Sequence, residues 1–153
     1  MGAKGILEEI SPEKGAYILQ IHVDKAFEAP IARLKNPLIR PGRYLYCGSA
    51  KGPGGIRARV KRHVKRDKKA HWHVDRLTIA FGVEALSIFE NTSECDLVSA
   101  VLEHSFASQP YPKFGSSDCE VCCAHLVHLD EGVELEGCGF SVPVLRPGHG
   151  TCF

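Results

Sequence analysis

The chain has 153 residues, of which 44% are hydrophobic and 24% charged, as is ordinary for a single globular domain. No run approaches the roughly 20 apolar residues of a membrane-spanning helix, and residues 1–11 lack the apolar segment of a secretory signal. We therefore expect a cytoplasmic protein with no membrane partner, whose seven cysteines are thiols rather than a disulfide framework.

Two strands are predicted in the first third of the chain. Apolar side chains alternate along residues 15–23 and place Tyr17, Leu19, Ile21 and Val23 on one face. Residues 24–42 contain three prolines and predict a connection. Residues 43–48 alternate again and predict a second strand, which the long connection allows to pair antiparallel with the first.

Helices and strands alternate in the rest of the chain. A Gly-Pro-Gly-Gly break at residues 52–55 precedes a predicted helix over residues 56–66, whose apolar stripe is Ile56, Val60 and Val64. The remaining predictions, in chain order, are a short helix over 71–78, a strand over 82–90, a helix over 91–104, turns over 111–123 and a strand over 124–129. This order predicts an α/β (α+β) domain over residues 15–129, in which helices flank a small, mainly antiparallel sheet. Residues 1–14 would be a leader, and residues 130–153 an acidic, Gly/Pro-rich C-terminal extension.

The net charge of +1 conceals a strong asymmetry between the two halves of the chain. Residues 1–80 carry 17 Lys/Arg against 7 Asp/Glu, whereas residues 81–153 carry 2 against 11. Such a basic half predicts a face that binds nucleic acid, although a charge run alone is as often a solvated helix face. The candidates for this contact are Arg57, Lys61, Arg62, Lys65, Arg66, Lys68, Lys69, His71 and His73. For the two histidines, structural hydrogen bonding is the alternative.

Five side chains are candidates for chemistry on phosphate: Tyr17, Tyr46, Arg59, His63 and Glu94. Arg59 and His63 lie four residues apart beside the apolar stripe of their predicted helix, and Glu94 lies in the first turn of a later helix. Hydrolysis of a phosphodiester needs a base, a cation that stabilises transition-state charge, and often a metal ion. Structural alternatives are strand packing for the tyrosines, a carboxylate partner for Arg59, core packing for His63, and an Asn91–Glu94 capping box.

Four motifs stand in a distinctive order: Gly15-Ala16-Tyr17, Tyr46-Cys47-Gly48, Arg57-x-Arg59-x-x-x-His63 and Glu94. In this order and spacing they resemble the GIY-YIG nuclease superfamily, with Ala16 and Cys47 where the family carries Ile. A closer resemblance, to the Uri-type branch, rests on Tyr46-Cys47-Gly48-Ser49-Ala50, Gly52-Pro53-Gly54-Gly55, His71-Trp72-His73-Val74-Asp75, Glu94-Cys95, residues 114–119 and His125-Leu126. Ser49 stands where some members carry Lys, and the Asn that often follows the Glu helix is not evident.

The resemblance implies a metal-dependent endonuclease that hydrolyses phosphodiester bonds in nucleic acid, with DNA as the expected substrate. It implies a three-stranded antiparallel sheet flanked by helices, and one Mg²⁺ or Mn²⁺ held by Glu94. Tyr17, helped by Tyr46, would act as the base or position the attacking water. Arg59 would stabilise the transition state, and His63 would assist proton transfer or hold phosphate.

A second candidate metal site consists of Cys119, Cys122, Cys123 and His125, all of which are ligands that zinc accepts. A single Cys-x-x-Cys lacks the second pair of a zinc finger, so thiols without metal are the alternative. Two other functions therefore stay open: a catalytically inactive nucleic-acid-binding module of the same fold, and an interaction protein organised by zinc. No sequence-reading module is evident, so specificity would come from substrate shape or from a protein partner.

Overall fold

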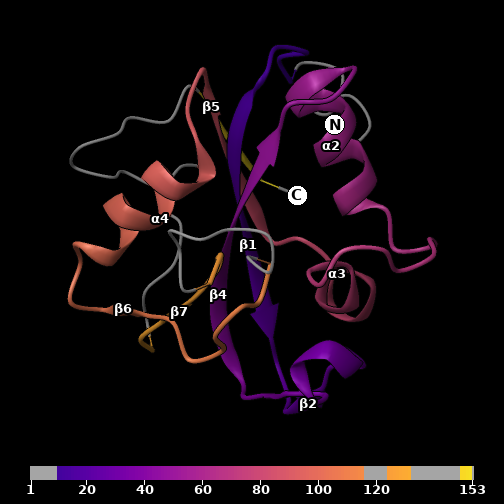
Figure 1. Ribbon diagram of the computed structural model, residues 1–153, viewed down its shortest axis with the longest axis vertical. Helices are drawn as coiled ribbons and strands as arrows, with labels where there is room; N and C mark the ends of the chain where they lie inside the picture. Colours follow the sequence, from indigo (N-terminus) through magenta and orange to yellow (C-terminus); the bar gives the residue numbers. More distant parts are fainter. Residues whose placement is uncertain (1–9, 116–123, 132–148, 153) are drawn as a thin grey trace.

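A computed structural model describes residues 10–115, 124–131 and 149–152, which form a central sheet with helices on both faces (Figure 1). The strands of this sheet are β1 (Gly15–Val23), β4 (Gly42–Ala50), β5 (Ala85–Glu90), β6 (Ala107–Ser108), β7 (Leu126–Leu129) and β8 (His149–Cys152). The helices are α2 (Gly55–Val64), α3 (Asp75–Phe81) and α4 (Glu94–Leu102). The connection between β1 and β4 holds a small hairpin of β2 (Phe27–Glu28) and β3 (Leu38–Ile39), with the 3₁₀ helix η1 (Ala32–Leu34) between them.

The strand order of the sheet is β6-β7-β4-β1-β5-β8, and every neighbouring pair is antiparallel. The predicted mixed α/β class with a mainly antiparallel sheet is therefore confirmed. The predicted number of three strands is wrong, because five strands of the central sheet lie within residues 15–129 and β8 adds a sixth from the C-terminal extension. β6 has only two residues, and β8 reads His-Gly-Thr-Cys, so neither shows the apolar alternation that predicts a strand.

The two tripeptide motifs lie side by side on the central strands. β1 pairs with β4 in a register that places Tyr17 opposite Gly48 and Leu19 opposite Tyr46. Gly48 has to be glycine at this point, because a Cβ there would collide with the phenol ring of Tyr17. The pairing thus brings both motif tyrosines into the middle of the sheet.

Each face of the sheet has its own apolar core. Tyr17, Leu19 and Ile21 pack toward α2 and α3, against residues such as Ile56 and Leu77. The alternate residues of β1, Ala16 and Ile18, pack toward α4 against Leu97, Val98 and Val101. The predicted alternation is therefore confirmed, and Figure 1 shows α4 on one side of the sheet with α2 and α3 on the other. Burying each large aliphatic side chain contributes roughly 1.5–3 kcal/mol, so both cores hold the layers together.

Two predicted helix starts are wrong. The helix predicted over residues 71–78 is α3, Asp75–Phe81, because the carboxylate of Asp75 accepts the backbone N–H groups of His71 and Trp72 and holds them in a turn. The Asn91–Glu94 capping box, which was the structural alternative for Glu94, does not form. Ser93 caps α4 instead, accepting the N–H of Asp96 at 3.1 Å.

In the described ranges, none of the helices is long and apolar enough to cross a membrane.

Candidate active site

A polar cleft of about 530 Å³ opens where the central strands meet α2, the residues before α3, and the start of α4. It is lined by Tyr17, Arg33, Tyr46, Gly48, Ser49, Arg59, His63, His71, Trp72, His73, Glu94, Gly115 and His125. All five side chains that the sequence nominates for phosphate chemistry are in this set. They come from four separate elements, which the fold brings to one place.

A short hydrogen bond at the base of the cleft joins β1 to α2. The hydroxyl of Tyr17 lies 2.6 Å from Nε2 of His63, and each side chain is only 1% exposed. Nδ1 of His63 lies 3.9 Å from Oδ1 of Asp75, which is too long for a hydrogen bond but close enough for the carboxylate to favour a proton on Nδ1. With Nδ1 protonated, Nε2 is the acceptor, and Tyr17 donates to it.

Burial keeps both members of this pair uncharged. It raises the pKa of Tyr17 well above its ordinary value, and the neighbouring Arg59 cation opposes that shift. Burial, aided by the Lys68 cation, lowers the pKa of His63 from 6.5 to about 3, although Asp75 acts in the other direction. Tyr17 therefore sits between a neutral acceptor and a cation, and the cation favours any negative charge that develops on the phenol oxygen.

Trp72 positions two of the basic side chains of α2. The guanidinium carbon of Arg59 lies 4.4 Å from the centre of the indole ring, and that of Arg62 lies 4.2 Å from it. Trp72 itself is half-buried and packs against the core. Stacking of guanidinium groups on an indole ring is favourable and limits their motion. Arg59 is thereby held at the cleft rather than extended into solvent.

Asp75 is the buried centre of an ionic network beneath the cleft. Its two oxygens accept from Arg62 at 2.8 and 2.9 Å, and Lys68 lies 3.7 Å away. Burial raises the pKa of Asp75, but the Arg62 hydrogen bonds and the N–H groups of His71 and Trp72 outweigh it and lower the pKa to about 2. The network anchors the C-terminal half of α2 to the start of α3.

This network changes the interpretation of three predicted nucleic-acid contacts. Arg62 pairs with Asp75, and the ammonium of Lys68, 6% exposed, donates to the carbonyls of Arg62 and His63 and to Thr78. Arg66 donates to the carbonyls of Ile79 and Ala80 at the end of α3. These three cations therefore stabilise the fold through intramolecular contacts, and their contact with nucleic acid stays a prediction.

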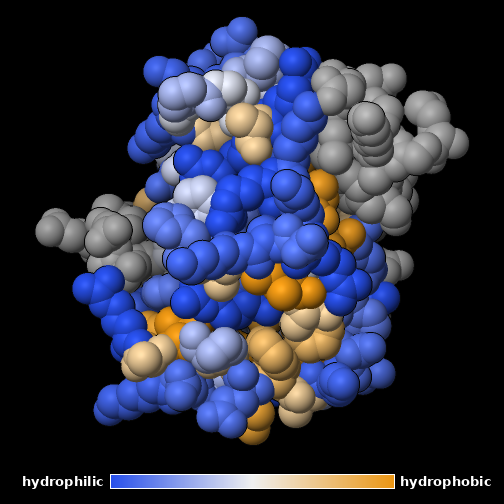
Figure 2. Space-filling model, turned by 90° about the vertical axis from the view of Figure 1, so that its right-hand side faces the viewer, coloured by the Kyte–Doolittle hydropathy of each residue, from blue (hydrophilic) through white to orange (hydrophobic). Residues whose placement is uncertain are grey.

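The other predicted contacts differ in their surroundings. Lys65 and Lys69 are exposed, whereas Arg57 is half-buried and donates to the carbonyl of Ile10. Figure 2 shows the side of the molecule formed by α2 and α3 as mainly hydrophilic. His71 and His73 line the cleft, and Nδ1 of His73 accepts the N–H of Gly115 at 2.9 Å. Lys61 has an intramolecular interaction of its own.

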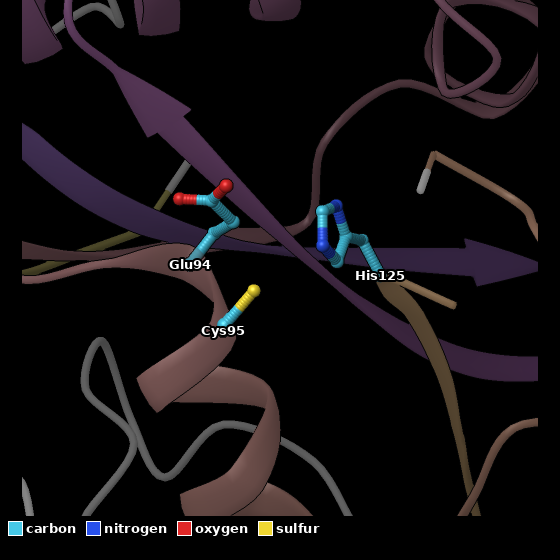
Figure 3. A group of neighbouring side chains, drawn as sticks. All are labelled: Glu94, Cys95 and His125. Atoms are coloured by element: carbon cyan, nitrogen blue, oxygen red, sulfur yellow. The ribbon is translucent and has the colours of Figure 1, made fainter. Parts of the chain in front are cut away.

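Glu94, at the start of α4, is the residue of the cleft best suited to hold a cation. Its Oε2 atom is buried and has no hydrogen-bond partner among the described residues. Cys95 and His125 lie beside it, with the ligand atoms of all three within 4.8 Å of one another (Figure 3). Cys119, Cys122 and Cys123, the other members of the predicted zinc group, lie outside the described residues.

Sequence reasoning missed two residues of this site. Arg33, in the exposed helix η1, lines the cleft, but its sequence surroundings carry no motif. Asp75 entered the sequence analysis only as a member of the His71–Asp75 motif. The available signal was that Asp67 and Asp75 are the only two carboxylates among the nine Lys/Arg of residues 57–76, since a buried cation requires a partner.

A comparison with protein-family models matches most of the chain. The family described as "Domain of unknown function DUF123" matches residues 16–140. No curated protein and no solved structure matches the chain. The matched range contains Ala16 and Tyr17 of the first tripeptide motif, the whole of the second, the basic helix and Glu94. The chain therefore belongs to the DUF123 family of GIY-YIG-like domains.

Proposed function

We propose that this protein is a metal-dependent endonuclease of the Uri-type branch of the GIY-YIG superfamily, hydrolysing phosphodiester bonds in nucleic acid, with DNA as the expected substrate. One observation carries the proposal: Tyr17, Arg59, His63 and Glu94 line a single cleft, and Tyr17 is hydrogen-bonded to a neutral histidine. These are the side-chain types that phosphodiester hydrolysis needs in one place.

In the proposed reaction, the Tyr17–His63 pair takes the proton of the attacking water. The water O–H proton moves to the phenol oxygen of Tyr17 while the phenol proton moves to Nε2 of His63. Hydroxide then attacks phosphorus, the ester P–O bond breaks, and the departing oxygen takes a proton from solvent water. The imidazolium that forms faces Asp75, whose carboxylate lies 3.9 Å from Nδ1. Because His63 has a pKa of about 3, this transfer depends on the phosphate charge, which raises the basicity of the ring.

The remaining residues of the cleft would stabilise the negative charge of the phosphate or hold the metal ion. Arg59 faces the same space as Tyr17 and stabilises negative charge on the pentavalent phosphate, a role worth several kcal/mol in comparable sites. Glu94 would hold the divalent ion, because its buried Oε2 has no hydrogen-bond partner among the described residues. That ion would supply Lewis-acid polarisation of the phosphate. Arg33 and His71 then contact flanking phosphates.

The alternative of an inactive nucleic-acid-binding module explains less of the structure. A binding module needs surface cations, such as Lys65 and Lys69, and has no use for a buried phenol–imidazole pair. Burying two polar groups at the base of a cleft costs desolvation energy that packing residues would avoid. A catalytic role accounts for both groups.

The test is cleavage of labelled single-stranded, duplex, flapped and branched DNA with Mg²⁺, Mn²⁺ or EDTA. Glu94→Gln should lose metal-dependent cleavage while keeping the fold. Glu103→Gln, an exposed position at the end of the same helix, is the matched control and should cut like wild type. Binding without any cleavage in all metals would favour the inactive module, and cleavage that survives Glu94→Gln would remove the metal from Glu94.

A further inference from the structure

Three potential ligand atoms converge beside the cleft. Glu94 and Cys95 stand in the first turn of α4, and His125 immediately precedes β7. The ligand atoms of the three side chains lie within 4.8 Å of one another, and Figure 3 shows them pointing toward a common space. The Uri-type resemblance includes Cys95 and His125 among its motif residues but implies a metal-binding role for Glu94 alone, so the convergence of the other two on Glu94 requires a separate explanation.

Two polar atoms of this group are buried without a hydrogen bond. His125 is 6% exposed, and neither its Nε2 nor Oε2 of Glu94 has a partner among the described residues. A buried donor or acceptor without a partner is destabilising, so proteins rarely keep one without a use. A cation between the two atoms would bind both and remove this cost.

The backbone holds His125 in place from both sides. Its carbonyl accepts the N–H of Cys47 at 3.0 Å, and its own N–H donates to the carbonyl of Phe114 at 2.9 Å. Ser93 likewise caps the helix that carries Glu94 and Cys95. The three side chains thus project from fixed backbone, which is the preorganisation that a metal site requires.

The chemistry of the three groups points to a particular class of ion. Mg²⁺ prefers oxygen ligands and keeps several waters, whereas imidazole nitrogen and thiolate sulfur favour later transition metals. From the donor set we infer that Glu94, His125 Nε2 and Cys95 Sγ form a three-ligand site for a zinc-class ion. Such a site leaves one coordination position, as zinc sites that perform hydrolysis do. Glu94 and His125 line the cleft, so an ion held between them would be accessible from it.

This inference rests on the proposed function only for the role of the ion, and metal binding is measurable without any nuclease assay. Co²⁺ is the probe, because a Co²⁺–thiolate bond gives a near-ultraviolet charge-transfer band and tetrahedral Co²⁺ gives strong visible absorption. The full chain should bind one Co²⁺ with both features. Zn²⁺ should displace it, and a hundredfold excess of Mg²⁺ should not.

The variants must separate this site from the cysteines at 119–123. Cys95→Ser should abolish the charge-transfer band, and His125→Asn should weaken Co²⁺ binding at least about tenfold. In Cys119→Ser/Cys122→Ser/Cys123→Ser the band should persist, and Cys47→Ala controls for a nearby buried thiol. A band that survives Cys95→Ser but vanishes in the triple variant would overturn the inference and assign the metal to the other cysteines.

A second readout covers variants that fold poorly. In the wild-type chain, Zn²⁺ should slow alkylation of Cys95 by iodoacetamide at least tenfold, as measured by mass spectrometry of its peptide, whereas Mg²⁺ should have no effect. Alkylation of Cys95 at an unchanged rate with saturating Zn²⁺ would contradict the inference. Metal binding at Cys95 without cleavage of any nucleic acid would support the metal site and reject the nuclease function. Mg²⁺-dependent cleavage without Co²⁺ or Zn²⁺ binding would support the nuclease function and reject the metal site.

Discussion

The hydroxyl oxygen of Tyr17 and Nε2 of His63 lie 2.6 Å apart, and both side chains are almost fully buried although they line a cleft. The pair links the first strand of the sheet to the basic helix, 46 residues further along the chain. A donor and an acceptor buried together satisfy each other, but removing either leaves its partner unpaired. Stability and proposed chemistry therefore depend on the same contact, and variants can separate the two.

Tyr17→Phe should lower the cleavage rate at least about a hundredfold, because it removes the group that takes the water proton. It should also destabilise the fold by roughly 1–3 kcal/mol, since Nε2 of His63 loses its partner. The matched control is Tyr44→Phe, whose hydroxyl donates to the carbonyl of Arg40 outside the cleft. Tyr44→Phe should keep near-normal cleavage. Equal rates for the two variants, measured at saturating metal, would remove Tyr17 from the chemistry.

Gly48→Ala should displace Tyr17 without removing any polar group from the cleft. The added Cβ would collide with the phenol ring, so the ring must move or the strands must separate. We expect a loss of about 1–3 kcal/mol in stability from overpacking, and at least a tenfold slower cleavage. Gly52→Ala is the control, because its nearest atom would be an Arg59 nitrogen 4.0 Å away. Urea unfolding and single-turnover cleavage measure the two effects, and indistinguishable variants would count against the tight packing around Tyr17.

Asp75→Asn should destabilise the protein far more than loss of an exposed ion pair. Asp75 is fully buried, and its neutralisation leaves the Arg62 and Lys68 charges without a counter-ion. We expect the free energy of unfolding to fall by about 3–5 kcal/mol. Glu84→Gln breaks the Arg43 pair at 3.1 Å, which is about one-third exposed, and should cost at most about 1 kcal/mol. Unfolding in urea provides the comparison. A cost for Asp75→Asn as small as that for Glu84→Gln would show that the network does not anchor α2.

Protonation of His63 should make the protein less stable as the pH falls below 6.5. Its pKa is 6.5 when unfolded and about 3 when folded, so the unfolded chain binds the extra proton between these values. Above pH 6.5, neutral His63 makes its full contribution to the free energy of unfolding. This contribution declines as the pH falls toward 3, by at most about 1.4 kcal/mol per pH unit. His63→Gln should flatten the profile in this window. Parallel profiles for the two proteins, measured by denaturant unfolding from pH 7 to 4, would contradict the low folded pKa.

The exposed lysines offer a test of nucleic-acid binding that leaves the fold alone. Lys65→Ala/Lys69→Ala should weaken duplex binding and reduce the slope of log affinity against log salt by about 0.9 for each lost phosphate contact. Thermal stability should not change, because the structure gives these ammonium groups no role in the core. Fluorescence anisotropy across a salt series measures the slope. An unchanged slope would show that Lys65 and Lys69 do not contact the phosphates.

The elements that sequence could predict are those with a periodic pattern. Alternation located β1 and β4, and the stripe of Ile56 and Val60 located α2, because each element buries one face. β6 and β8 carry no such pattern and depend on pairing with strands far away in the chain. The start of α3 was misplaced because a local side-chain contact competes with the helix: the Asp75 carboxylate accepts the backbone N–H groups of His71 and Trp72 and holds them in a turn.

In the candidate site too, sequence could predict residues with fixed motif spacing but not the contacts between distant segments. Motif spacing identified Tyr17, Arg59 and Glu94, since these lie at fixed positions on strands and helices. It could not tell that Arg62 and Lys68 point inward, because a basic run looks the same whether its members meet phosphate or Asp75. Nor could it place His125 beside Glu94, since 31 positions separate them and only the sheet brings them together.

The last strand of the sheet also protects its neighbour. β5 is almost entirely apolar, reading Ala-Leu-Ser-Ile-Phe-Glu, and β8 pairs with it along residues 85–88. Without β8, those backbone groups would form an open sheet edge with no charge before Glu90, the kind of edge that recruits strands from other molecules. A chain truncated after Leu129 would therefore tend to aggregate through β5, so the short C-terminal strand helps to keep each molecule separate from its copies.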